Sequence, residues 1–369
     1  MNRMKLGEIL SVKHGWAFKG EYFAEDGEQS ILTPGNFFEK GGFKPNNGKE
    51  RYYTGTYPKE YLCHKGDLIV AMTQQAEGLL GSTALVPENN KHLHNQRIGL
   101  ITCNEKRLNK LFAYYLFMTK SVREQLERSS SGTKVKHTSP EKIYDVEVEI
   151  PDVISQQKIA NLLWAIDEKI ANNNAINDNL EQQMHLIFEN MMAKAATHKL
   201  SGEYTIAQNL ATVVTGKEDA NFSVPNGKYK FFTCSNTPLS CDEYVFDSSS
   251  ILIAGNGDFN VKHYSGKFNA YQRTYVLTPD KKYFGLLYLA SLCRINSFKS
   301  RSSGSIVKFI TKSDVENIPV FIPNDRFYLQ ELNKLIYLQE QNKLENELLV
   351  NLRDWLLPML MNGQATISD

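Results

Sequence analysis

The chain of 369 residues contains two copies of one segment, and this internal repeat limits its possible folds more than any other feature. At a shift of 172 residues, without a gap, a Ser-Ser-Gly loop, a Val-Lys pair and an Ile-Pro pair recur. The matched pairs are Ser130/Ser302, Ser131/Ser303, Gly132/Gly304, Val135/Val307, Lys136/Lys308, Ile150/Ile322 and Pro151/Pro323. Solenoid repeats have periods of roughly 20 to 50 residues. We therefore expect two copies of a globular domain followed by a helix, with approximate two-fold symmetry in one chain.

A heptad pattern of apolar residues follows each globular half and predicts two long helices. Both patterns carry polar residues at mid-length, which are Asn173 and Asn177 in the first and Asn342 and Glu345 in the second. We expect the helices to pair antiparallel with their polar middles in contact. Packing of each helix on its own domain or on another protein is the alternative. The expected helix-pairing residues are Ile159, Leu163, Ile166, Ile170, Leu180, Met184, Leu335, Leu338, Leu349, Leu352 and Leu356.

Each globular half is a series of short β-type runs between Gly, Pro and Asn turns, followed by a helix over 107–128 or 284–298. The expected strands are LGEIL, SILT, DLIVAM, STALV and RIGLIT, and then TIAQNLATVV, YKFFT, SILIAG and TYVLT. The fold class is α+β, with two similar globular domains of mixed β-sheet and helices joined by two long helices that form an antiparallel coiled coil. The expected parts are a first domain (1–152), a central helix (153–199), a second domain (200–324) and a C-terminal helix (325–369).

Charge is distributed unevenly along the chain, although its formal net charge is only +1. Residues 1–150 hold 21 basic and 18 acidic side chains and residues 200–323 hold 13 and 10, so each globular half carries +3. The helical stretches 151–199 and 324–369 carry −2 and −3. So weak a field argues against indiscriminate binding to a polyanion. Contacts to nucleic acid must come from local clusters or from partner subunits.

Motifs for catalysis or cofactor binding are missing from the sequence. It has no G-x-x-x-x-G-K-[ST] loop, no strand-associated G-x-G-x-x-G and no Asn-Pro-Pro or Asp-Pro-Pro motif of adenine methyltransferases. Five cysteines without a C-x-x-C pair argue against a zinc site or a disulfide framework, and His92 and His94 lack further metal ligands. We find no signal peptide or membrane span, and expect a cytoplasmic location. The chain is expected to be a non-catalytic binding protein without its own cofactor.

The Ser-Gly loop after each domain's helix is flanked by cations and predicts a phosphate contact. A solvated surface loop is the alternative. Gln, Asn and Lys residues after equivalent strands are candidates for contacts to base edges. The Gln-Arg pairs at 96–97 and 272–273 recur, which suggests a common structural role. The candidate DNA-binding residues are Gln74, Gln75, Arg97, Arg128, Lys134, Lys136, Asn256, Asn260, Lys262, Arg273, Arg301 and Lys308.

Two helical segments carry a family resemblance. The run SQQKIANLLWAIDEKI (155–170), after a domain that ends in EVEIP, and the run LLPMLMNGQ (356–364) closely resemble segments of type I restriction-modification specificity subunits. The resemblance extends over the whole chain in duplication, order and length, and it is specific in the helices and weak in the globular halves. One departure is YLQELNKLIYL (328–338), which lacks the Gln-Gln-Lys-Ile form found at 156–159.

The resemblance implies that each globular half is a target-recognition domain for one half of a bipartite, asymmetric sequence in double-stranded DNA. It implies that the helices set the half-site spacing and dock two adenine-methyltransferase (M) subunits, with restriction/translocase (R) subunits joining for cleavage. S-adenosylmethionine, ATP and Mg²⁺ are then expected on those partners, in a bacterial or archaeal cytoplasm and away from membranes. A coiled-coil adaptor that does not bind DNA, and a nuclease or methyltransferase that acts alone, are the alternatives.

Overall fold

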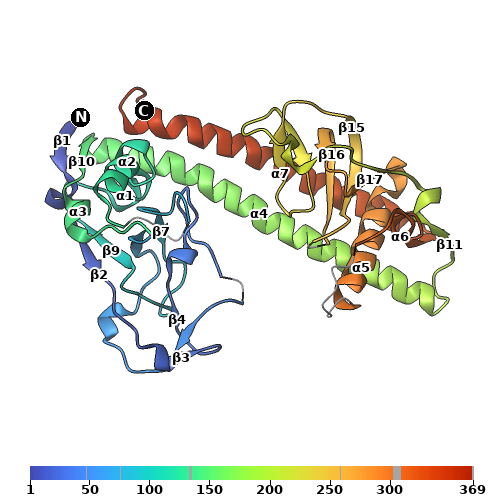
Figure 1. The fold of residues 1–369 in the computed structure, drawn as a ribbon, viewed down its shortest axis with the longest axis horizontal. Coiled ribbons are helices and arrows are strands. Elements are labelled where there is room, and N and C mark those ends of the chain that lie inside the picture. The colour runs from blue at the N-terminus through green and yellow to red at the C-terminus, as the bar shows by residue number, and fades with distance from the viewer. Residues whose placement is uncertain (47, 75, 133–134, 258, 302–308, 368–369) are drawn as a thin grey trace. The chain divides into compact units, whose positions relative to one another are not determined.

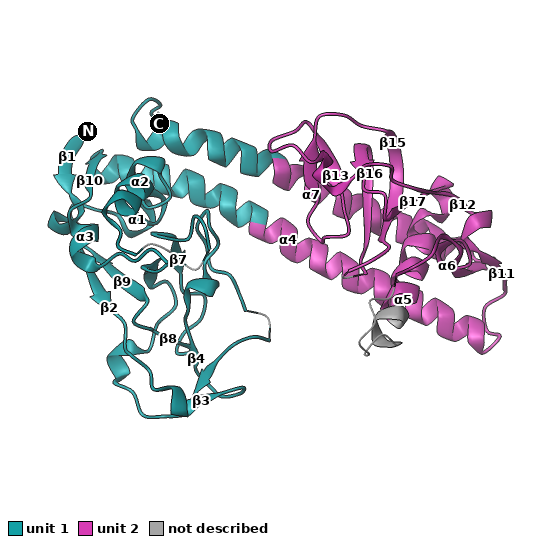
Figure 2. Ribbon diagram, viewed as in Figure 1, with its two compact units in different colours: residues 1–170, 348–369 teal, residues 171–347 magenta. Residues whose placement is uncertain are grey.

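A computed structural model describes the chain except residues 47, 75, 133–134, 258, 302–308 and 368–369, and the side chains of 297–301. The chain divides into two compact units, residues 1–170 with 348–369 (unit 1) and residues 171–347 (unit 2), as coloured in Figure 2. Each unit combines one globular half with one segment of each long helix. None of the helices in the described ranges is long and apolar enough to cross a membrane.

Unit 1 contains a four-stranded antiparallel sheet in the order β2-β9-β6-β7, a sheet of short strands in the order β3-β5-β4-β8, and the pair β1-β10 (Figure 1). Its strands are β1 (Asn2–Lys5), β2 (Leu10–His14), β3 (Phe23–Ala24), β4 (Ser30–Ile31), β5 (Tyr52–Tyr53), β6 (Leu68–Ala71), β7 (Thr83–Leu85), β8 (His92–Leu93), β9 (Ile98–Cys103) and β10 (Glu147–Ile150). Its short helices are α1 (Lys110–Leu116), α2 (Lys120–Ser129) and α3 (Pro140–Tyr144).

Two local predictions for unit 1 are wrong. The single helix expected over 107–128 is two helices, because Thr119 is extended (φ −66°, ψ 144°) and its hydroxyl donates to the Leu116 carbonyl at 2.7 Å. The expected strand LGEIL begins with a 3-10 turn at Leu6–Glu8, since the Glu8 carboxylate accepts the Lys5 N–H at 2.8 Å. Local side-chain bonds therefore override the apolar pattern in both places.

Unit 2 is built on a six-stranded sheet in the order β12-β17-β15-β16-β13-β14, with β11 and β18 paired apart from it (Figure 1). Its strands are β11 (Gly202–Ile206), β12 (Ala211–Thr215), β13 (Tyr229–Phe232), β14 (Leu239–Cys241), β15 (Phe246–Ala254), β16 (Val261–Ala270), β17 (Thr274–Pro279) and β18 (Pro319–Pro323). Its helices α5 (Phe284–Arg301) and α6 (Lys312–Glu316) precede α7 (Arg326–Met361). The expected strand TIAQNLATVV is two strands, β11 and β12, separated by a 3-10 turn at Ala207–Asn209.

Strand pairing confirms the duplication predicted from the sequence. The partner residues are Asn2:Ile150 and Val12:Ile101 in unit 1, and Glu203:Ile322 and Val213:Leu277 in unit 2. The first members of the pairs are related by a shift of 201 residues, and the second members by shifts of 172 and 176. Both units therefore pair their strands in the same register around the same frame.

The long helices α4 (Val153–Ala196) and α7 pair antiparallel within each unit. In unit 2 the Asn173 amide donates to Glu345 at 2.7 Å, and the Asn342 amide donates to Asn177 at 2.9 Å. The expected meeting of the polar middles is confirmed. Both helices also contribute to the hydrophobic cores of the globular halves, so they pack on the domains as well as on each other. The α+β class with two sheet-rich halves and long paired helices is confirmed.

Candidate nucleic-acid interface

A cleft of about 580 Å³ in unit 1 gathers three exposed cations, Lys49, Arg51 and Arg97. Lys49 and Arg51 lie just before β5, and Arg97 lies just before β9. Within the described part of the chain, none of the three side chains forms an ion pair with a carboxylate. The cleft is also lined by Phe18, Phe23, Ile31, Thr33, Pro34, Asn46, Asn95 and Gln96. It therefore combines positive charge, amide groups and aromatic rings.

Backbone hydrogen bonds build the turn that carries Arg97. The Ile98 N–H donates to the Asn95 carbonyl at 2.9 Å, and the Gln96 N–H donates to the Trp16 carbonyl at 3.1 Å. The Asn95 side chain accepts the N–H of Arg97 at 3.1 Å. Because the backbone is held in this way, the side chains of Gln96 and Arg97 are left in solvent.

Unit 2 builds the same turn before β17. The Thr274 N–H donates to the Tyr271 carbonyl at 2.8 Å, and the Gln272 N–H donates to the Glu218 carbonyl at 2.9 Å. The side chains of Gln272 and Arg273 are exposed, as at the first turn. The recurrent Gln-Arg pair thus occupies one structural position in both halves.

The predicted phosphate-binding loop of unit 1 has its described cations paired with carboxylates. Lys136 forms an ion pair with Glu127, and Arg128 forms one with Glu124 at 3.0 Å. Arg123, which precedes the loop, is buried, and its guanidinium donates to the carbonyls of Phe117, Gly78, Leu80 and Glu39. Burial lowers the pKa of Arg123 to about 10. Arg123 therefore closes the fold around the loop 78–81 and does not face solvent as a free cation.

The strand end at Gln74 lies beside this loop. The Gln74 N–H donates to the Lys136 carbonyl at 2.9 Å, and the Thr73 hydroxyl contacts the His137 Nδ1 at 3.0 Å. The structure therefore brings together two of the candidate DNA-binding residues, Gln74 and Lys136. Of the other candidates, Gln75, Lys134 and Lys308 lie outside the described residues, and only the backbone of Arg301, at the end of α5, is described.

In unit 2 the candidate residues Asn260 and Lys262 point at a neighbouring loop. The Asn260 amide donates to the Cys234 carbonyl at 2.8 Å, and the Lys262 ammonium donates to the Thr233 carbonyl at 3.3 Å. Burial lowers the pKa of Lys262 to about 8. These two side chains hold the loop that begins at Thr233, whereas Asn256 is half-buried at the end of β15.

Comparison with known proteins decides the family. A family model described as "Type I restriction modification DNA specificity domain" matches residues 1–182 and 210–351. The chain belongs to this family. Over 164 residues it is 36% identical to the EcoDI specificity subunit of Escherichia coli, a match that covers 42% of this chain and 37% of that protein. It is 23% identical over 304 residues to the MjaIX specificity subunit of Methanocaldococcus jannaschii, covering 70% of this chain and 69% of that protein.

The fold also agrees with that of a solved specificity subunit. The S subunit of the type I restriction-modification system from M. genitalium superposes with a TM-score of 0.63 at 18% identity, covering 100% of this chain and 96% of that chain. At this identity the likeness shows the fold alone. The match to the Escherichia coli relative spans only 37% of its length, and a second match, to the MjaVIII specificity subunit of Methanocaldococcus jannaschii, spans 39%.

The paired helices of this specificity-domain protein differ in part from the predicted seam. On α4 the expected pairing residues are buried or half-buried, whereas Leu338 and Leu352 on α7 are 40% and 44% exposed. Gln339 and Arg353 lie against α4 in their place, bound to Glu181 at 2.9 Å and to Asp167 at 2.8 Å. The prediction is wrong at these two leucines because polar contacts rotate α7 by about one position. Leu335, Leu349 and Leu356 are buried or half-buried.

The helical motif shared with type I specificity subunits has an anchoring role. Gln156, 0% exposed, accepts the N–H of Asn109 at the start of α1, and its amide donates to the carbonyls of Arg107 and Pro151. At the matching position of the second copy, Tyr328 is buried and its hydroxyl accepts from Lys194 at 3.2 Å. The missing Gln-Gln-Lys-Ile form thus changes contacts inside the chain.

No group of three or more metal-ligating side chains occurs among the described residues. His92 Nδ1 contacts the Ser30 hydroxyl at 2.9 Å, and His94 Nε2 donates to the Ile98 carbonyl at 2.7 Å. Burial lowers the pKa of His94 to about 4 and also lowers that of His92. Both histidines are structural residues of the first half.

Proposed function

We propose that this chain recognises DNA for a type I restriction-modification complex, with each globular half reading one part of a bipartite, asymmetric sequence. The observation that carries the proposal is the exposed Gln-Arg turn, which both halves build at the same place in the sheet. The symmetry of a DNA-binding protein is matched by the symmetry of its target. A duplicated frame with different neighbouring side chains therefore suits two half-sites of different sequence.

The cleft of unit 1 has the chemistry for both parts of DNA recognition. Lys49, Arg51 and Arg97 can neutralise phosphates and release counterions, which dominates affinity. Arginine and the amides Asn95 and Gln96 can also make paired hydrogen bonds to base edges. Because these cations lack carboxylate partners, no ion pair is broken when DNA binds there.

The loop that contains Lys136 fits an auxiliary phosphate contact. Lys136 and Arg128 must leave Glu127 and Glu124 to reach a phosphate. Exposed ion pairs of this kind contribute only about 0 to 1 kcal/mol, so the exchange costs little but also yields little. We therefore assign the main affinity of the first half to the cleft.

The exposed side of α7 supports a protein-docking role. Apolar side chains in each unit are largely exposed, namely Leu348, Leu352 and Trp355 in unit 1, and Tyr337, Leu338 and Leu344 in unit 2. Exposed apolar groups of this size suit a protein partner. In the proposal two adenine-methyltransferase subunits dock along the helices and R subunits join them. S-adenosylmethionine, ATP and Mg²⁺ then act on those partners in the cytoplasm, while this chain contributes no catalytic group.

Mapping of methylated adenines tests the proposal. The chain is expressed with its methyltransferase in a host without other adenine methylation, and methylated sites are mapped with and without the chain. We expect methylation only at one motif with two short parts and a fixed gap, and only when the chain is present. Methylation that is unchanged by removal of the chain, or that follows no such motif, would contradict it. An adaptor without DNA specificity gives that second result.

A further inference from the structure

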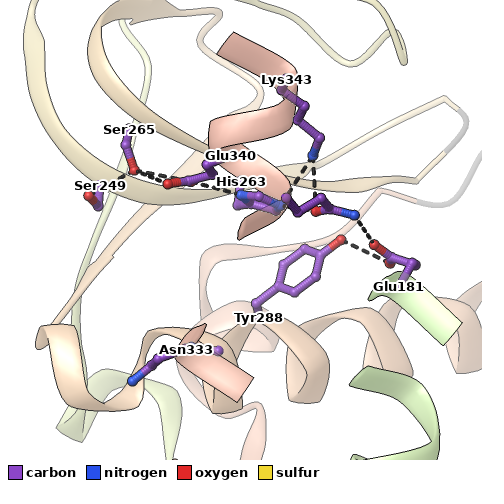
Figure 3. Close-up of polar contacts among 10 residues, drawn as sticks. Glu181, Ser249, His263, Ser265, Tyr288, Asn333, Glu340 and Lys343 are labelled. Atoms are coloured by element: carbon purple, nitrogen blue, oxygen red, sulfur yellow. Dashed lines mark hydrogen bonds and ion pairs between the residues drawn. The ribbon is translucent and has the colours of Figure 1, made fainter. Parts of the chain in front are cut away.

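A buried polar cluster lies where the sheet of unit 2 packs on the paired helices, and His263 is at its centre (Figure 3). The His263 side chain, on β16, is 2% exposed. Its Nδ1 lies 3.0 Å from a carboxylate oxygen of Glu340 on α7, and its Nε2 lies 2.8 Å from the side-chain oxygen of Gln339. Both ring nitrogens therefore face oxygen atoms.

The orientation of the Gln339 amide is set by its other contacts. Its nitrogen donates to the Glu181 carboxylate at 2.9 Å, so its oxygen must point at His263. Flipping the amide would bring an oxygen against the Glu181 carboxylate. The same Gln339 oxygen accepts from Lys343 at 3.1 Å, which leaves its second lone pair for the His263 Nε2–H. With Glu340 on the other side, the Nδ1 also donates, and the ring is an imidazolium.

The charges around the ring agree with this protonation state. Glu181 and Glu340 are acidic, and Lys343 lies 3.3 Å from the His263 Nε2. With a cationic His263 the four groups sum to zero, as buried charges require. Burial disfavours ionised Glu340, but hydrogen bonds and charges from His263, Ser265 and Lys343 outweigh burial, so the pKa of Glu340 is lowered.

The remaining neighbours of His263 come from four elements. α5 contributes the rings of Phe284 and Tyr288, and the Tyr288 hydroxyl donates to Glu181 at 3.3 Å. On α4, His185 lies 3.7 Å from Glu181. Ser265 on β16 donates to Glu340, and Lys230 on β13 is paired with Glu347. Of the titratable side chains described around the ring, only His263 has both nitrogens enclosed by acceptors.

The first half has no such group at the matching position. β6 pairs Leu68 with Leu85 and with Ile101, and β15 pairs Ile251 with His263 and with Leu277. Because Ile101 and Leu277 are equivalent, His263 takes the place of Leu85, which packs in the apolar core of unit 1. A buried cation thus replaces an apolar contact in the second half only.

We propose that His263, held as an imidazolium between Glu340 and Gln339, is a positioning residue that fixes the sheet of unit 2 on α7. It rests on the proposed DNA recognition in one respect: the second half then needs this single proton to present its DNA-reading loops correctly. Loss of the proton leaves Glu340 without its partner and weakens the second half, and the first half is unaffected.

Histidine NMR on the full chain tests the protonation state without DNA. The chain is labelled with ¹⁵N-histidine, and His263→Gln identifies the His263 signals. We expect both ring nitrogens to carry hydrogen near neutral pH in the wild type. A ring with one unprotonated nitrogen under these conditions would overturn the inference, whether or not the chain recognises DNA.

Protection of DNA by the complex with its methyltransferase tests the positioning role. In the wild type we expect protection of one tract to weaken roughly tenfold as the pH rises through the titration of histidine, while the other tract is unchanged. His263→Gln should show the weakened protection of that tract at every pH. His185→Gln is the matched control because its ring lies near Glu181, and it should keep the wild-type profile. An unchanged profile in His263→Gln, or loss of the profile in His185→Gln, would overturn the proposal.

Glu340→Gln keeps the test decisive if His263→Gln does not fold. Removal of the carboxylate leaves the imidazolium without its negative partner, so the weakening should begin at a lower pH. Weakening at the wild-type pH in this variant would contradict a role for the His263–Glu340 pair. Absence of any protected tract in all proteins would instead refute the proposed function and leave the NMR result standing.

Discussion

The two units hold their sheets on the helix pair with one arrangement of three side chains but with different charges. In each unit a tyrosine from the helix after the sheet donates to a carboxylate on α4, and a side chain of α7 donates to the same carboxylate. The sets are Tyr115, Asp167 and Arg353 in unit 1, and Tyr288, Glu181 and Gln339 in unit 2. The geometry was kept after duplication while the chemistry changed.

The repeat explains where the charge went. A shift of 172 residues relates Asp167 to Gln339 and Glu181 to Arg353, so the two sets exchange helices. The carboxylate nevertheless stays on α4 in both units. In unit 1 the cation Arg353 faces it directly, whereas in unit 2 the neutral Gln339 passes the contact on to His263 and Lys343. A duplicated frame thus tolerates different polar groups if each remains paired.

The anchors at the first helix of each half differ in position but share one task. In unit 1 Gln156 on α4 accepts the N–H of Asn109. In unit 2 Asn333 on α7 accepts the N–H of Gly285 at 2.8 Å and donates to the carbonyls of Lys281 and Lys282. Each amide ties the start of a helix to the long helix that follows the domain.

Removal of the Gln156 anchor should have the largest effect. Gln156→Ala leaves buried backbone groups unsatisfied, and we expect a loss of about 3 kcal/mol in the free energy of unfolding. Asn333→Ala, at a half-buried site, should cost about 1 kcal/mol. Urea unfolding of the full chain measures both. Equal losses would show that the two anchors are equivalent despite their different burial.

Breaking the charged set of unit 1 should come second. Arg353→Ala leaves the Asp167 carboxylate, about 20% exposed, with only Tyr115 as its partner, and we expect a loss of about 2 kcal/mol. Asp167→Asn in the same chain should recover part of that loss, because the unpaired charge is then gone. If the double variant is as unstable as the sum of the single ones, the pair is not coupled.

The two basic regions of the first half should differ in DNA binding. Arg51→Ala should weaken protection of one tract by roughly tenfold, since Arg51 has no carboxylate partner among the described residues. Lys136→Ala, the matched control from the loop, should change protection by less than about threefold because Lys136 already pairs with Glu127. Titrations at two salt concentrations measure both. The reverse order would move the main phosphate contact to the loop.

Acid should distinguish the cluster of unit 2 by the smallest effect. The pKa of Glu340 is lowered in the folded chain, so its carboxylate adds stability above its unfolded pKa of about 4.3 and loses it as the pH falls through the lower folded pKa. Glu340→Gln should therefore flatten the acid limb of the unfolding curve, as followed by circular dichroism. A limb of unchanged slope would assign the acid sensitivity to other carboxylates.

Much of the frame could be predicted from the sequence, because it depends on apolar periodicity. The buried run Leu68–Ala71, the seam of α4 and the shift of 172 residues all follow from side-chain pattern. β16 was missed because its polar and charged residues, with Gly266, read as a loop. Its central place in the sheet is set by long-range pairing with β15 and β13.

The site was predicted less well, because pairing partners far apart in sequence decide which cations are free. Arg97 was found through its recurrence in the repeat, whereas Lys49 and Arg51 lie in a loop without a counterpart and were missed. The cluster Lys49-Glu50-Arg51 was their only local signal. Nothing near Lys136 in the sequence shows that Glu127 returns beside it. The shift from Leu338 to Gln339 likewise needed the partner helix.

Footprinting of the chain with its methyltransferase on duplex DNA tests the central claim most directly. The account predicts two short protected tracts separated by a fixed gap, with Arg51→Ala losing only one of them. A single continuous tract, or equal loss of both tracts in that variant, would contradict recognition by two independent halves.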